Sequence, residues 1–157
     1  MSKRQQVRWF GDRVLSQVEK QAARNMDSAA IHLVNELKSE LGRAPGPPRG
    51  AASQAGEPPH YRTHQLQRSH TFDRPGPLVR RVGPDTTIPH GKVVALELGS
   101  PPYEIRAKGG GFLYFQVGGH WVRTRVVHHP GLEARPWLRP VFDRERPELR
   151  RIMGRRA

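Results

Sequence analysis

The sequence predicts an α+β fold with a long N-terminal helix, a small antiparallel β-sheet containing a Gly-Gly hairpin, and a C-terminal helix. Apolar residues recur every three or four positions through residues 5–41, which is the period of a helix. From Leu66 onward, short runs rich in β-branched and aromatic residues alternate with Gly and Pro turn signals. The chain of 157 residues has the length of one domain. We divide it into a helix (1–42), a Pro/Gly-rich arm or linker (43–64) and a β-sheet with the C-terminal helix (65–157).

The N-terminal segment carries an apolar stripe, and Gly42 is placed to end it because glycine accepts the left-handed conformation found after a helix. The pattern fits one helix, or two helices joined near Asn25. A single helix would be about 55 Å long at about 1.5 Å per residue. That length favours packing on a partner or lining a ring, although a bent helix folded on the chain's own sheet would satisfy the same pattern. The stripe comprises Val7, Phe10, Val14, Val18, Ala22, Met26, Ala29, Leu33, Leu37 and Leu41.

Residues 43–60 contain five prolines and three glycines, a composition that excludes a helix or a central strand. The stretch is either a passive linker or an arm that becomes ordered on a neighbouring subunit. In the second interpretation Pro45, Pro47 and Pro48 are candidate subunit contacts.

Three β-rich regions come next along the chain. Thr71–Phe72 and Leu78–Val82 flank a turn at residues 74–77, and Lys92–Leu98 is a further predicted strand. Residues 112–117 and 120–127 flank Gly118-Gly119, which is a strong hairpin signal.

A two-residue turn at these glycines pairs Val117 with His120 and gives the predicted hairpin two faces. We expect Leu113, Phe115, Val122 and Val126 on the core face. The other face combines aromatic and arginine side chains, which are enriched at protein interfaces. Arginine stems that cover aromatic rings on a solvated face would be the alternative. The candidate subunit interface on this second face comprises Phe112, Tyr114, Trp121, Arg123 and Arg125.

A last helical segment is predicted over roughly Pro136–Met153, and Pro136 and Pro140 fall where a first turn tolerates proline. Pro147 is predicted to break it into two short helices. We expect Leu138, Val141, Phe142, Leu149 and Ile152 to form its apolar side, and residues 128–138 to form the turn that docks it. Trp137 is a further candidate for the subunit interface. The basic residues that are candidates for contact with DNA or an acidic partner are Arg144, Arg146, Arg150, Arg151, Arg155 and Arg156.

The net charge of +13 is uneven: residues 1–42 carry +2 and residues 43–157 carry +11. Such an excess suggests polyanions or acidic proteins as partners, although arginine codons in a GC-rich genome would produce the same bias. The absence of cysteine excludes disulfides and thiolate sites. No apolar run reaches the roughly 20 residues of a membrane span, and the basic N-terminus lacks the apolar stretch of a signal peptide. We expect a soluble protein made in a cytoplasm, without a membrane partner.

The sequence offers no recognisable catalytic set. The glycines at 109–111 precede a predicted strand rather than a helix, unlike a nucleotide-binding loop. Glu97 and Glu104 flank a Pro-Pro turn and are expected to be exposed. His120 and His128 lie too far apart along a strand to chelate one ion. We therefore expect no enzymatic activity, no cofactor and no metal.

A segment at residues 55–72, AGEPPHYRTHQLQRSHTF, resembles the phage tail-completion family of minor tail, neck-associated proteins. Gly56-Glu57-Pro58-Pro59 matches one family motif, and Thr63, Leu66, Arg68 and Ser69 match a second. His64 and His70 depart from it, standing where the family has Gly and Ile.

Further motifs of this family occur in order over residues 56–153, roughly 60% of the chain. Trp137 replaces the family's usual Phe, and His129 is a small insertion. The matching residues are Glu97-Leu98-Gly99, Tyr103-Glu104-Ile105, Leu113-Tyr114-Phe115, Gly118-Gly119, Val127-His128-His129-Pro130-Gly131 and Arg135-Pro136-Trp137-Leu138.

The resemblance implies the α+β fold above and a structural role in the virion, in a ring of six subunits at the head-to-tail junction. Its implied partners are other copies of the chain, neighbouring neck, connector and tail-tube proteins, and packaged DNA in the channel. An Arg-rich nucleic-acid-binding protein is the alternative, and steep salt dependence of DNA binding would distinguish it.

Overall fold

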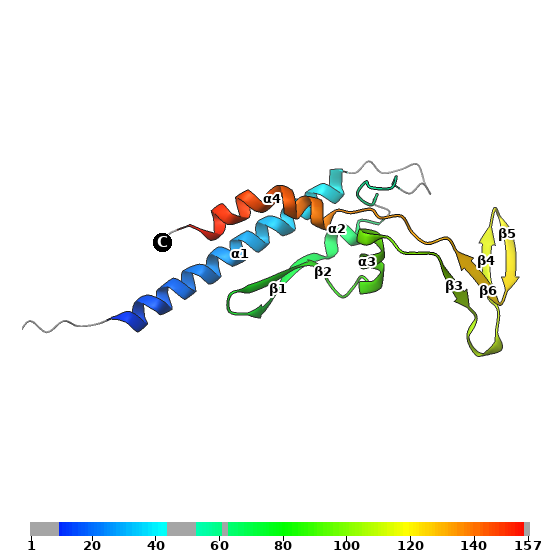
Figure 1. Ribbon diagram of the computed structural model, residues 1–157, viewed down its shortest axis with the longest axis horizontal. Helices are drawn as coiled ribbons and strands as arrows, with labels where there is room; N and C mark the ends of the chain where they lie inside the picture. Colours follow the sequence, from blue (N-terminus) through cyan, green and yellow to red (C-terminus); the bar gives the residue numbers. More distant parts are fainter. Residues whose placement is uncertain (1–9, 44–52, 61–62, 156–157) are drawn as a thin grey trace, which may run out of the picture.

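The computed structural model describes residues 10–43, 53–60 and 63–155, and they form the predicted α+β arrangement. A long helix, α1, is followed by short helices, two-stranded antiparallel sheets and a C-terminal helix, α4 (Figure 1). In chain order the elements are α1 (Gly11–Arg43), α2 (Gln65–Ser69), β1 (His70–Gly76), β2 (Val79–Pro84), α3 (His90–Leu98), β3 (Tyr103–Arg106), the 3-10 turn η1 (Lys108–Gly110), β4 (Leu113–Val117), β5 (His120–Thr124), β6 (Val126–His129) and α4 (Leu138–Met153).

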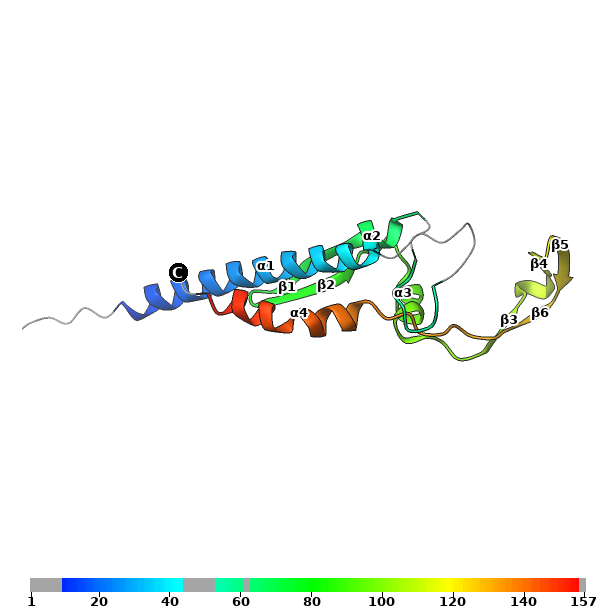
Figure 2. The same cartoon turned by 90° about the horizontal axis from the view of Figure 1, so that it is seen from above.

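The core lies between α1 and α4, which run antiparallel side by side (Figures 1 and 2). The C-terminal part of the predicted stripe supplies one half of this core, and the segment that begins at Trp137 supplies the other. Burial of these apolar side chains is the main force that holds the two helices together. The buried cluster comprises Ala29, Leu33, Leu37 and Leu41 with Trp137, Val141, Leu149 and Ile152.

Two polar contacts position the ends of α4. The Glu97 carboxylate accepts hydrogen bonds from the backbone N–H groups of Trp137 (2.8 Å), Leu138 (3.1 Å) and Arg139 (2.9 Å), which have no partner within the helix. At the other end, Asn25 Nδ2 donates to the carbonyls of Met153 (3.1 Å) and Arg155 (2.7 Å). Glu97 is therefore a capping residue and not a solvent-exposed carboxylate.

The β1–β2 hairpin packs beside α1, where Asp27 binds two of its arginines. Arg80 donates to Asp27 and to the carbonyl of Ala23 (3.2 Å), and Arg74 donates to Asp27 at 3.0 Å. These hydrogen bonds hold the pKa of the Asp27 carboxyl below its usual value. A turn does join these two strands, but it lies at Pro77 and Leu78 rather than at residues 74–77, because β1 continues to Gly76.

The structure corrects the predictions for α3 and α4 and decides between the two alternatives for α1. Lys92–Leu98 lies in the helix α3 rather than in a strand. α1 is continuous, because Asn25 caps α4 and does not interrupt its own helix. α4 also remains one helix through Pro147, because Val141 and Leu149 are buried on either side of the proline, whereas Phe142, expected on the apolar side, is exposed.

The remaining strands form an arm, residues 101–131, that extends away from the helices (Figures 1 and 2). Ser100 and Leu132 close its base with reciprocal backbone hydrogen bonds of 2.8 and 3.0 Å. Gly99 is required there, because its φ is +78° and an added Cβ would lie 2.7 Å from the Leu132 carbonyl oxygen. Within the arm, β3 pairs with β6 and β4 pairs with β5, so the single predicted sheet is divided into separate two-stranded sheets.

The predicted register of the Gly-Gly hairpin is confirmed, from Val117 opposite His120 to Leu113 opposite Thr124. The face of this hairpin that was expected to join the core does not do so. The side chains of Leu113, Phe115 and Val122 are only half-buried and lie outside the main core, because the arm has no helix to cover them. Val126 belongs to the next strand, β6, and pairs with Arg106.

Candidate interaction surfaces

The outer face of the β4–β5 hairpin gathers the aromatic and arginine residues that the sequence paired. Tyr114 lies opposite Arg123 and Trp121 opposite Gln116, so their side chains share one face. Gly118 and Gly119, with φ of +57° and +85°, form the tight turn that sets this register.

Only part of this face is covered by the arginines. The guanidinium of Arg123 lies 3.6 Å from the ring centroid of Phe112 and 5.8 Å from that of Tyr114, and the guanidinium of Arg125 lies 5.1 Å from the Phe112 ring. These are cation–π distances. Tyr114 nevertheless remains 63% exposed and Trp121 73% exposed. The guanidinium groups therefore cover only part of Phe112, which stays 38% exposed, and leave the rings of Tyr114 and Trp121 in water.

An exposed Trp–Tyr pair on a narrow arm has the chemistry of an interaction surface. Tryptophan, tyrosine and arginine are the residues that contribute most often to binding energy at interfaces. The arm, residues 101–131, also carries four basic residues and one acidic residue, Glu104, which adds a positive charge to the surface. We call Phe112, Tyr114, Trp121, Arg123 and Arg125 the hairpin face.

The prediction that Trp137 lies at a subunit interface is wrong. Its side chain is 0% exposed and its Nε1 donates a hydrogen bond of 2.9 Å to His70 Nε2. The sequence gives no sign of this pairing, because 67 residues separate the two partners. The other predicted interface residues, Pro45, Pro47 and Pro48, lie outside the described residues.

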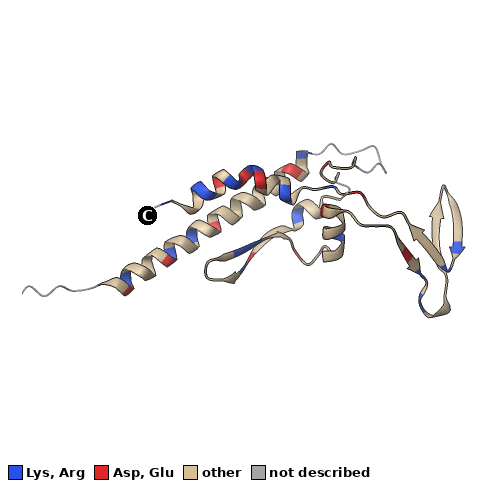
Figure 3. Cartoon of the chain, in the orientation of Figure 1, with Lys and Arg blue, Asp and Glu red and all other residues tan. Residues whose placement is uncertain are grey.

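The predicted basic end carries acidic residues among its arginines (Figure 3), and three of its arginines form ion pairs within the chain. Arg144 binds Glu40 at 2.9 Å and Glu145 at 3.0 Å, and these hydrogen bonds raise the pKa of its guanidinium. Arg146 pairs with Asp143, and Arg151 pairs with Glu148 and lowers the pKa of that carboxyl.

Two other members of this basic set form no ion pair with an acidic residue among the described residues. Arg150 and Arg155 are exposed, and the Arg155 carbonyl binds Asn25. Arg156 lies outside the described residues. α4 as a whole has five arginines and three acidic residues, so it is a mixed surface and not a continuous basic one.

A second exposed apolar surface comprises Phe10 and the first third of α1. Phe10, Val14 and Val18 belong to the predicted apolar stripe, whereas Leu15 does not. Phe10, Val14, Leu15 and Val18 are all more than half exposed, because α4 ends near Asn25 and does not reach them. The helical period identifies the apolar stripe of α1. The length of α4 determines how far along α1 this stripe is buried.

Within the described parts of the chain, no three metal-ligating side chains cluster to hold an ion, and no helix combines the length and apolarity needed to cross a membrane. Comparisons with protein-family models, with curated proteins and with solved structures find no match to this chain.

Proposed function

We propose that this protein is a structural subunit of a tailed-phage particle that forms a ring in the neck, at the junction of head and tail. The observation that carries the proposal is the arm, which presents the exposed hairpin face far from the chain's own core. The ordered motifs over residues 56–153 support the same role through their resemblance to tail-completion proteins.

The geometry favours association between copies through two different surfaces. An arm at one end of an elongated chain reaches a surface on the next copy that differs from itself. Such heterologous contacts generate rings when the rotation closes. The resemblance suggests six subunits and suggests neighbouring connector and tail-tube proteins as further partners. In this proposal the location is the virion neck, and packaged DNA passes through the channel.

The rival is an Arg-rich nucleic-acid-binding protein. The ion pairs of Arg144, Arg146 and Arg151 weaken it, because their positive charge is already partly balanced within the chain. The arm is positively charged, so a weak, salt-sensitive contact with DNA is compatible with the proposed ring.

The test is the mass of the purified chain, measured by native mass spectrometry and light scattering. We expect a ring-sized oligomer for the natural chain and monomers for the variant Tyr114→Ala/Trp121→Ala. Leu78→Ala is the matched control, because Leu78 is an exposed apolar residue on the β1–β2 turn, away from the arm.

Two results would contradict the proposal: a natural chain that stays monomeric at high concentration and binds DNA with a steep salt dependence, or an oligomer that the double variant leaves intact. Particles made without the protein provide the second test, and we expect filled heads that lack attached tails.

A further inference from the structure

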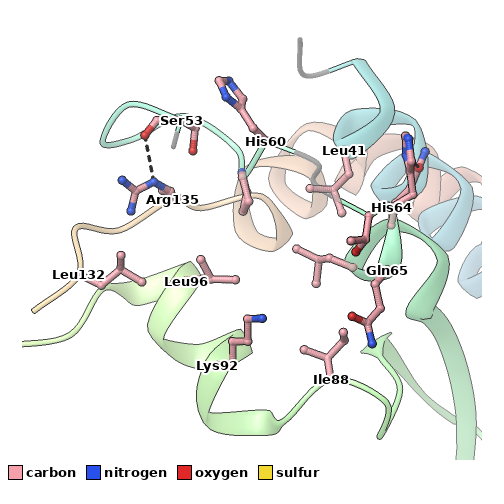
Figure 4. Close-up of a pocket in the computed structure, with 14 residues that line it drawn as sticks. Leu41, Ser53, His60, His64, Gln65, Ile88, Lys92, Leu96, Leu132 and Arg135 are labelled. Carbon is pink, nitrogen blue, oxygen red and sulfur yellow. Dashed lines mark hydrogen bonds between the residues drawn. The ribbon is translucent and has the colours of Figure 1, made fainter. Parts of the chain in front are cut away.

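A cavity of about 430 Å³ lies between the end of α1, the segments at residues 53–60 and 63–67, the helix α3 and the extended segment that leads to α4 (Figure 4). It is partly open to solvent. Its volume is within the range of pockets that hold small organic ligands. None of its residues belongs to the hairpin face, so a ligand-binding role for the cavity does not depend on the proposed function.

The walls of the cavity are mainly apolar. Leu41, Leu66, Ile88, Leu96 and Leu132 come from five different segments of the chain and surround the hollow. Leu96 points into it in Figure 4. An apolar group that enters would displace water from these side chains, which is favourable in proportion to the area removed from water.

Three polar groups stand out in the lining of the cavity, and two of them, Lys92 and Arg135, are cationic. Lys92 extends into the hollow between Leu96 and Ile88 (Figure 4), and its ammonium has no acidic partner among the described residues. Arg135 donates to the carbonyls of Ser53 and Glu133. None of the lining residues that the structure describes is acidic.

The third polar group is the hydroxyl of Ser53. The residue is 4% exposed, yet its Oγ has no hydrogen-bond partner in the described parts of the chain. Leaving a buried hydroxyl unpaired costs about 1–3 kcal/mol. A ligand with an acceptor oxygen would receive its hydrogen bond and remove that cost.

We propose that this cavity binds a carboxylate attached to an apolar body, with the apolar body against the leucines and the carboxylate near Lys92, Arg135 and the Ser53 hydroxyl. A singly charged carboxylate suits the site better than a phosphate, because desolvating a more highly charged group among so many apolar side chains would cost more. The same chemistry occurs in a fatty acid and in the C-terminus of an apolar peptide.

The test measures binding to the full-length chain by isothermal calorimetry, with decanoate as the charged probe and 1-decanol as its neutral counterpart. We expect decanoate to bind and decanol to bind at least fivefold more weakly. Lys92→Met should weaken decanoate binding about threefold to fivefold, as expected for a partly exposed ion pair, and leave decanol unchanged. Ser53→Ala should weaken decanoate as well.

Lys108→Met is the control, because Lys108 lies on the arm and is exposed. Circular dichroism establishes that each variant keeps its fold. Lys92 is exposed, so Lys92→Met still tests the proposal if Ser53→Ala unfolds the chain.

N-acetyl-Ala-Leu-Leu, with a free carboxylate or an amide at its C-terminus, distinguishes the two sources of the carboxylate. Tighter binding of the free peptide than of decanoate points to a neighbouring chain's terminus, and the reverse order to a fatty acid.

Two outcomes would overturn the proposal: no binding of either carboxylate, or equal binding of decanoate and decanol. Equal binding of the amidated and free peptides would exclude a peptide C-terminus as the source of the carboxylate.

Discussion

At the scale of single residues, the contact between Trp137 and His70 has the clearest energetic consequence. Indole Nε1 is only a donor, so His70 Nε2 must accept and be unprotonated. His70 Nδ1 then carries the proton and donates to the Leu66 carbonyl at 2.7 Å. Both nitrogens of the neutral His70 ring are therefore in hydrogen bonds. Protonation of Nε2 would place its N–H against the N–H of the Trp137 indole.

This contact predicts a loss of stability in acid. Burial lowers the pKa of His70 below the ordinary histidine value of 6.5. The unfolded chain takes up a proton near that value while the folded chain does not, so stability is present above about pH 6.5 and falls below it, until the pH reaches the folded pKa. The loss for this group approaches about 1.4 kcal/mol per pH unit.

Urea unfolding of the natural chain, His70→Gln and His120→Gln between pH 7.5 and 5.5 measures this slope. We expect a flatter dependence for His70→Gln and an unchanged one for His120→Gln, because His120 is exposed. Carboxylates with lowered pKa values, such as Asp27, contribute equally in all three chains. Identical slopes in all three would show that the His70 proton is not linked to folding.

At the scale of elements, the start of α4 shows how neighbours override local signals. Helix α3 carries a β-rich sequence, yet the helical form places Val93 and Leu96 against the core and Glu97 at the start of α4. Propensity for a strand is worth less than about 1 kcal/mol per residue, so packing and the three hydrogen bonds to Glu97 decide the outcome.

Pro147 predicts a stabilising substitution. It is exposed and lies inside α4, where proline lacks the N–H that would bind the carbonyl of residue 143. Pro147→Ala should raise the free energy of unfolding by about 1–2 kcal/mol, less than the full helix penalty of about 3 because proline also restricts the unfolded chain.

Thermal and urea unfolding would check this value, with Pro140→Ala as the control. Pro140 lies in the first turn of α4, where the N–H has no partner within the helix, so we expect almost no change there. A lower free energy of unfolding for Pro147→Ala would contradict this prediction and would mean that Pro147 stabilises the folded chain.

At the scale of the whole molecule, the chain consists of a helical body and an arm joined at one narrow point. The body holds the buried cluster, whereas no residue of the arm contributes to it. The bridge between Ser100 and Leu132 lets the body close without the arm. The arm therefore contributes surface and not stability.

Replacement of residues 101–131 by Gly-Gly tests this division. We expect the melting temperature to stay within a few degrees of the natural chain, since the core is intact, and the oligomer to be lost. Calorimetry and light scattering measure the two effects. An unfolded variant would show that the arm supports the body, and a persistent oligomer would place the subunit contact elsewhere.

Local spacing along the chain was enough to predict the long helix, the Gly-Gly register, the shared face of Tyr114, Trp121 and Arg123, and the presence of a turn between β1 and β2 though not its exact position. Each depends on residues close together in the chain, where spacing sets which side chains share a face.

What those faces contact was settled by the packing of distant elements. This packing buried Trp137 against His70, converted Glu97 into the cap of α4, paired Arg144 of α4 with Glu40 of α1, and left Val14 and Val18 exposed. Most of these outcomes depend on partners tens of residues away, and spacing along the chain does not specify which segments meet at such separations.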